Sequence, residues 1–255
     1  MMDLLTLLRT ICKDHVLSPS AIFRPTGAGK IKWPLTIKDE VALEKALRDG
    51  GHFLPLPTEP AALANVLEQS IISFLLERLP QVPGITARKG TERGYPDVEI
   101  EQNGKYYALD VKVAKRQSTK TKPATRTQSR ITLYTGNTYF AYPERRWPGT
   151  FRPFAEYSSH LDLIALYTFN EETLSHVEDL QILVHEPWTI ASKKRSSTTR
   201  EYIGAVMSLA DLEAGCGEFK TEKAFYDYWR GFNFKVGNAV KIQLRKMLKE
   251  SAGIK

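Results

Sequence analysis

Apolar residues recur along the chain at spacings that separate helices from strands. Near the start, Leu4, Leu5, Leu8 and Ile11 recur at helical spacing and predict a helix within 1–16. A longer helix is expected to begin after Thr58, its N-cap, and to run to about Leu79. Its core-facing stripe consists of Leu63, Val66, Leu67, Ile71, Phe74, Leu75 and Leu79.

The remaining pattern alternates strands with short helices. A hairpin is expected over 95–113, buried strands over 161–169 and 180–185, and helices near 39–48 and 220–231. No repeat, low-complexity tract or linker divides the chain. The sequence therefore predicts one α/β domain over 1–255 with a central mixed sheet.

Asn103-Gly104 fixes the register expected of the hairpin. A two-residue turn at this dipeptide places Ile100 opposite Tyr107 and Asp97 opposite Asp110. Because side chains alternate along a strand, one face is apolar and the other is expected to present charge. The apolar face holds Val98, Ile100, Tyr107, Leu109 and Val111, and the polar face holds Asp97, Glu99, Ala108, Asp110 and Lys112.

The facing aspartates are the strongest chemical signal in the sequence. Two carboxylates opposite each other repel unless a cation lies between them, and Mg²⁺ favours such oxygen ligands. Such an ion would activate water against a phosphodiester. Lys112 shares that face and would stabilise the charge that develops at phosphorus. The alternative is a surface hairpin with solvated charges.

Glu68 lies on or beside the buried stripe of the long helix. Ala64, Ile71 and Ile72 are one turn away from it. On this evidence the glutamate is either a site residue that helps hold metal or a boundary residue that reaches water.

Basic residues are clustered rather than spread evenly. The chain has 36 Lys and Arg against 29 Asp and Glu, a formal charge of +7. The stretch 111–143 lacks acidic residues but contains Lys112, Lys115, Arg116 and four further basic residues, and 187–200 is similar. These patches favour contacts with phosphates, with Lys115 and Arg116 among them, over a merely solvated surface.

Cysteine content and hydropathy exclude other classes of protein. Cys12 and Cys216 are the two cysteines, so neither a disulfide framework nor a paired-cysteine zinc site is expected. A reducing cytoplasm fits this composition. No apolar run is long enough to span a membrane, and Asp3, Arg9 and Lys13 interrupt any signal-peptide core.

Pro96-Asp97 followed by Asp110-Val111-Lys112 resembles the catalytic motif of the PD-(D/E)xK nucleases. Over about 61–232 the chain also resembles the EcoRV family of type II restriction endonucleases, in a patchy but ordered way. The matching segments include Thr132-Leu133, Trp188, Ser197-Thr198-Thr199, Ile203-Gly204 and Asp227-Tyr228-Trp229-Arg230. Glu68 falls at the spacing of a helix-borne glutamate in that family's active site.

The resemblance implies a restriction-endonuclease-like fold and a Mg²⁺-dependent homodimer that cuts double-stranded DNA at a palindrome, leaving blunt ends. A cognate DNA methyltransferase is then expected in the same cell. The catalytic core would span about 60–140, and 1–59 would contribute to dimerisation. The recognition region would span about 187–205, with a loop formed by Lys194, Arg195, Ser196, Ser197, Thr198, Thr199 and Arg200.

Two other functions fit the same residues. One is a monomeric repair or nicking nuclease with this core, and the other is a DNA-binding protein without catalysis. An insertion of some two dozen residues after Leu35 and a longer recognition loop separate the chain from its relatives. The target sequence therefore cannot be carried over from the family.

Overall fold

The computed structural model describes residues 3–17, 25–26, 41, 52–53, 60–91, 94–117, 122–172 and 176–251. The helix predicted over 39–48, apart from Val41, and the predicted N-cap Thr58 lie outside these residues. Within the described part of the chain, no helix is long and apolar enough to cross a membrane.

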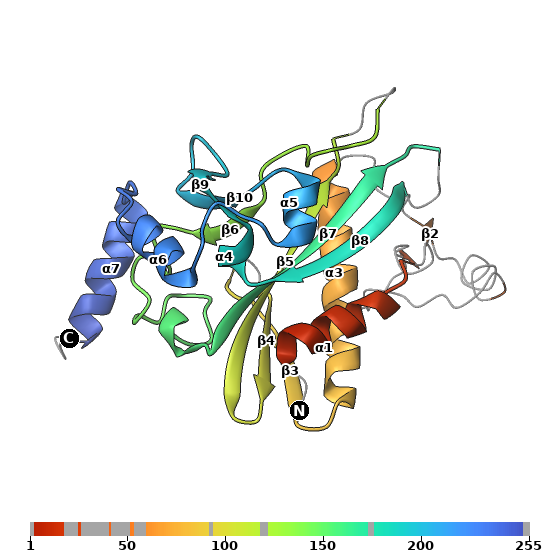
Figure 1. The fold of residues 1–255 in the computed structure, drawn as a ribbon. Coiled ribbons are helices and arrows are strands. Elements are labelled where there is room, and N and C mark those ends of the chain that lie inside the picture. The colour runs from red at the N-terminus through yellow and green to blue at the C-terminus, as the bar shows by residue number, and fades with distance from the viewer. Residues whose placement is uncertain are drawn as a thin grey trace.

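The centre of the molecule is a five-stranded mixed sheet (Figure 1). Its order is β3 (Ile85–Lys89), β4 (Val98–Gln102), β5 (Lys105–Lys115), β7 (Ser159–Phe169) and β8 (Val177–His185). The β5–β7 pair is parallel and the other pairs are antiparallel. The mixed α/β fold predicted from the sequence is thereby confirmed.

Two helices cover one face of this sheet. Helix α3 (Pro60–Arg78) lies along β5 and β3, and α1 (Leu4–Ile11) lies against β8 (Figure 1). Asp3 caps α1 by accepting a hydrogen bond from the Thr6 N–H. Short 3₁₀ turns follow each helix, at Cys12–Asp14 and Leu79–Gln81. The core between helices and sheet includes Leu8, Ile71, Leu75, Val98, Ile100, Leu109, Val111 and Leu163.

The second face of the sheet is also covered. A smaller sheet, ordered β6 (Thr132–Thr135), β10 (Tyr202–Ala205) and β9 (Ala191–Arg195), packs there with α4 (Pro187–Ile190), α5 (Leu209–Ala214) and α6 (Glu222–Arg230). An aromatic core fills this layer: Tyr95, Tyr134, Phe140, Phe154, Phe225 and Trp229. The segment 136–157, with its 3₁₀ turn Phe154–Glu156, closes it.

Two further parts lie outside these layers. Helix α7 (Asn238–Ser251) is a largely exposed C-terminal helix beside α6 (Figure 1). The two-residue strands β1 (Pro25–Thr26) and β2 (His52–Phe53) pair with each other.

The hairpin register matches the prediction. Ile100 pairs with Tyr107 and Val98 with Leu109, around Asn103 and Gly104 at φ of 54° and 75°. Positive φ at both positions is the requirement that Asn-Gly meets in such turns. The polar face of the hairpin presents charge but is itself covered, because Ala108 is fully buried and Glu99 is 3% exposed under the second layer.

Candidate active site

Asp97 and Asp110 lie side by side where β4 begins. The Asp97 N–H donates to Oδ1 of Asp110 at 3.3 Å, and the Val111 N–H donates to Oδ2 of Asp97 at 2.7 Å. Asp97 is half-buried and Asp110 is buried. The pairing of β4 and β5 therefore places the two carboxylates together, as the turn register predicted.

Lys112 neutralises part of this charge. Its Nζ donates to Oδ2 of Asp110 at 2.6 Å. Burial would lower the pKa of the Lys112 ammonium, but Asp110 and Asp97 outweigh burial and raise that pKa. Burial, followed by the charge of Asp110, raises the pKa of Asp97 to about 7. The site therefore holds more negative charge than one lysine compensates.

Glu68 reaches this site from helix α3. It lines two cavities together with Asp97, one of about 730 Å³ beside Gly90 and Thr91 and one of about 250 Å³ beside Lys112 and Thr132. Burial raises the pKa of Glu68, and Lys112 is the strongest charge that opposes this. Of the two interpretations open from the sequence, the structure favours a glutamate facing the site.

The residues at this site suit Mg²⁺ bound in the way that is usual in proteins. Among the described residues, no three His, Cys, Asp or Glu side chains converge as a closed cage would require. Mg²⁺ instead uses one or two carboxylates and completes its shell with water and substrate phosphate. Asp97 and Asp110 supply two adjacent carboxylates with surplus negative charge, and Asp97 lines both cavities, so these residues suit that mode of binding.

The sequence analysis missed a third carboxylate, Asp162. In the parallel pair β5–β7 it is the direct partner of Asp110. Its side chain is fully buried, and burial raises its pKa well above the ordinary value. The available signal was a single acidic residue inside the apolar run of β7, but the strand's neighbour could not be known from the sequence.

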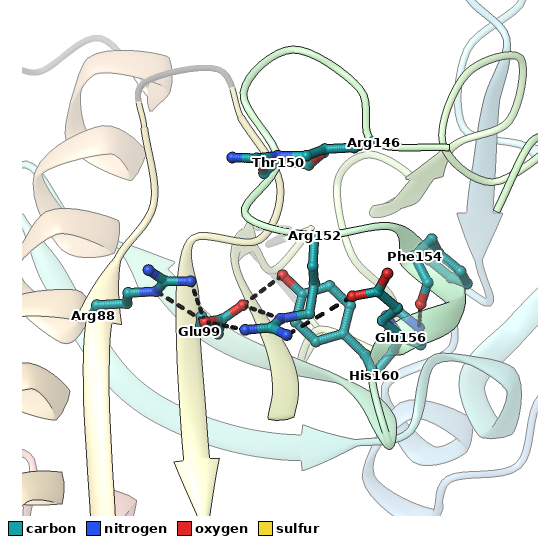
Figure 2. Close-up of polar contacts among 9 residues, drawn as sticks. Arg88, Glu99, Arg146, Thr150, Arg152, Phe154, Glu156 and His160 are labelled. Carbon is teal, nitrogen blue, oxygen red and sulfur yellow. Dashed lines mark hydrogen bonds and ion pairs between the residues drawn. The ribbon is translucent and has the colours of Figure 1, made fainter. Parts of the chain in front are cut away.

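An ion network around the buried Glu99 carboxylate stands next to the site. The Glu99 carboxylate accepts hydrogen bonds from Arg88 at 2.8 Å, Arg152 at 2.7 Å and Tyr157 at 3.1 Å (Figure 2). The segment that carries Arg152 also bonds to the residues before Asp97, since Tyr95 N–H donates to the Gly149 carbonyl at 3.2 Å. The network thus anchors the backbone that leads into the β4–β5 hairpin.

The predicted recognition loop forms the turn between β9 and β10. Lys194, Thr198, Thr199 and Arg200 are exposed there, whereas Arg195 is held by Glu201 at 2.9 Å and Ser196 bonds to Thr132 at 2.7 Å. Ser197 hydrogen-bonds within the turn. Because β6 supplies Thr132 to the smaller site cavity, the sheet that carries the loop adjoins the site.

Lys115 and Arg116 extend away from the aspartates at the far end of β5. The Lys115 ammonium lies 4.5 Å from the Phe169 ring centre, and Arg116 bonds to Gln181 at 2.8 Å and to the Asp179 carbonyl. The role of these two residues in DNA binding stays a prediction. Their present partners on β7 and β8 would compete with phosphate.

A mixed sheet that holds two carboxylates and a lysine on adjacent strands defines the class of PD-(D/E)xK nucleases. A family model described as restriction endonuclease EcoRV matches residues 30–251. The chain belongs to this family of restriction endonucleases, and it is accordingly a deoxyribonuclease with double-stranded DNA as its substrate. None of the curated proteins compared with the chain matches it.

Proposed function

We propose that the chain is a Mg²⁺-dependent type II restriction endonuclease that cuts DNA at a specific palindromic site and leaves blunt ends with 5′-phosphates. The observation that carries this proposal is the contact of Asp97, Asp110 and Lys112, in which Asp97 lines both cavities and Lys112 lines the smaller one. Family membership indicates double-stranded DNA as the substrate, and the site residues provide the groups that phosphodiester hydrolysis needs.

Each site residue has a separate task in this proposal. Asp97 and Asp110 hold magnesium, and Glu68 helps from α3. When bound, the ion would lower the pKa of a coordinated water and offset charge on the phosphate. Lys112 positions that water and donates hydrogen bonds toward the charge that develops on the phosphate oxygens. Its half-buried ammonium stays charged, because the neighbouring carboxylates raise its pKa.

The exposed residues of the β9–β10 turn are proposed to read the base sequence. Lys194, Thr198, Thr199 and Arg200 are exposed and would enter a groove, and Arg195 is oriented by Glu201. A homodimer with one site per strand would produce the symmetric cut, and 1–59 would contribute to its interface. Such an enzyme would work in the cytoplasm beside a cognate methyltransferase that protects the host DNA.

Digestion of plasmid DNA of known sequence tests the proposal. With Mg²⁺ we expect discrete fragments whose mapped ends are blunt and share one palindrome, and with chelator no cutting. Lys112→Ala should bind the same DNA without cutting it, because one lysine contributes little among many phosphate contacts. The exposed Lys223→Ala on α6 is the matched control and should cut normally. A smear without preferred ends would remove the site-specific proposal.

Cutting of one strand alone would favour the nicking alternative. Binding without any cleavage, in the presence of magnesium, would favour the non-catalytic alternative. The close approach of Asp97 and Asp110 argues against the latter, since DNA binding alone gives no reason to place two carboxylates where phosphate must come.

A further inference from the structure

Three aspartates stand in a row across the sheet. Asp97 leads into β4, Asp110 lies on β5, and Asp162 on β7 pairs with Asp110. Neighbours in register point to the same face, and adjacent strands are about 4.8 Å apart. The row therefore continues from the two proposed metal ligands to a third carboxyl group inside the protein.

The Asp162 side chain has no obvious structural purpose. It is fully buried, and neither carboxyl oxygen has a hydrogen-bond partner among the residues that the structure describes. Its neighbours along β7 are Leu161 and Leu163. A buried polar group without a partner is destabilising, so an apolar residue would serve packing better.

The cation relevant to Asp162 is Lys112. It holds Oδ2 of Asp110 at 2.6 Å, an oxygen that a metal ion on Asp110 would also need. Burial raises the pKa of Asp162, and Lys112 is the charged group that most opposes this. An ammonium that gives up Asp110 needs another acceptor, because its side chain is only 23% exposed.

We propose that Asp162 is a positioning residue that accepts the Lys112 ammonium when a divalent cation occupies Asp110. The inference rests on the proposed function of the aspartate pair. Asp162 does not touch substrate in this arrangement. It removes the competition between lysine and metal for one carboxylate, and it keeps Lys112 beside the reacting phosphate.

Metal affinity, measured apart from cleavage, tests this role. Mn²⁺ binding to the full-length protein is followed by calorimetry and by the metal-induced shift in Tm. For Asp162→Asn we expect about tenfold weaker Mn²⁺ binding, equivalent to about 1.4 kcal/mol. Without metal, its Tm should not fall, since the native carboxyl makes no hydrogen bond. The exposed Asp227→Asn on α6 makes the same substitution elsewhere and should bind Mn²⁺ as the wild type does.

The decisive comparison repeats Asp162→Asn in a Lys112→Met background. If Asp162 acts through Lys112, its effect on Mn²⁺ affinity should largely disappear there. An equally large loss in both backgrounds would overturn the proposal in favour of direct attraction between Asp162 and the metal. Unchanged affinity in the wild-type background would also overturn it.

Two further outcomes can be distinguished from a failure of the proposal for Asp162. Failure of the wild type to bind Mn²⁺ at all would contradict the proposed function rather than the role of Asp162. If Asp162→Asn does not fold, Asp162→Leu gives the same readout, because it removes the carboxyl without burying an amide.

Discussion

At the residue scale, the candidate active site is an arrangement of like charges that one lysine stabilises incompletely. Asp97 and Asp110 are in contact, and only Asp110 is bonded to Lys112. The two aspartates are therefore not equivalent in the metal-free protein. Removing the charge of Asp97 mainly relieves its repulsion with Asp110, whereas removing the charge of Asp110 also takes away the hydrogen-bonded partner of the half-buried Lys112 ammonium.

This difference predicts opposite effects of two isosteric variants. Without metal, Asp97→Asn should raise the free energy of unfolding by about 1 kcal/mol, and Asp110→Asn should lower it by a similar amount. Neither variant should be stabilised by Mg²⁺, since each loses a ligand. Denaturant unfolding of both variants and the wild type, with chelator and with Mg²⁺, provides the measurement. Equal shifts in the same direction would contradict the asymmetric pairing.

A second residue-scale prediction concerns His160 and acid stability. Its Nε2–H donates to the Phe154 carbonyl at 3.1 Å, so Nδ1 accepts from the Tyr95 hydroxyl at 2.6 Å. This neutral ring is buried, and burial lowers its pKa to about 3. Below an unfolded pKa of about 6.5, the unfolded chain binds a proton that the folded chain rejects. His160 therefore costs stability as pH falls from about 6.5 toward 3.

His160→Gln should remove this loss. The variant is expected to be less stable than the wild type at pH 8, and the difference should shrink by up to about 1.4 kcal/mol per pH unit between pH 6 and 4. Urea unfolding at several pH values measures it, with the half-buried His176→Gln as the control. A constant difference across that range would mean that His160 is protonated in the folded protein.

At the scale of elements, the hairpin could be predicted because its signals are local in the sequence. Contacts between segments that are distant in the sequence could not be predicted. Asn103-Gly104 and the alternation of apolar residues fix the β4–β5 register, which is why the Asp97–Asp110 contact was foreseeable. The burial of Glu99 was not, because Arg152 lies 53 residues away in sequence. Asp162 was missed for the same reason, since a parallel neighbour depends on the crossover between β5 and β7.

The loop before Asp97 gives an element-scale prediction. Gly90 N–H donates to the Asp97 carbonyl at 2.7 Å, and a Cβ at Gly90 would lie 2.0 Å from the Pro96 carbonyl oxygen. Gly90→Ala must therefore displace backbone next to Asp97. A displacement near 1 Å can reduce turnover by about a hundredfold, so we expect at least a tenfold loss in kcat.

Gly104→Ala is the matched control for that loop. Gly104 has a φ of 75° but nothing within 4 Å, so alanine there adds backbone strain without a clash. It should cost about 1 kcal/mol of stability and leave kcat unchanged. Steady-state cleavage and thermal unfolding of both variants separate the two effects. Normal turnover in Gly90→Ala would show that the approach of this loop to Asp97 has no role in catalysis.

At the scale of the whole molecule, net charge and family membership indicate DNA as the partner, but they do not determine the oligomeric state. The formal charge of +7 suits a polyanion, and the recognition turn adjoins the site through β6. The α/β fold could be predicted from the sequence because its strands and helices have strong local patterns. The oligomeric state could not be predicted in this way. The predicted dimerisation region 1–59 falls largely outside the described residues, and the symmetry of an oligomer leaves no local pattern in the sequence.

Mixed dimers distinguish a homodimer from a monomer that cuts twice. Differently tagged wild-type and Lys112→Ala chains are co-expressed, and the doubly tagged species is purified and weighed by light scattering. A stable species of twice 28.9 kDa is expected. On a supercoiled plasmid with one target site, it should accumulate nicked circles, because only one of its two sites can hydrolyse its strand. The wild-type homodimer should yield linear DNA directly. If the chain acts as a monomer, no doubly tagged species will form, and a simple mixture will produce linear DNA at half the rate.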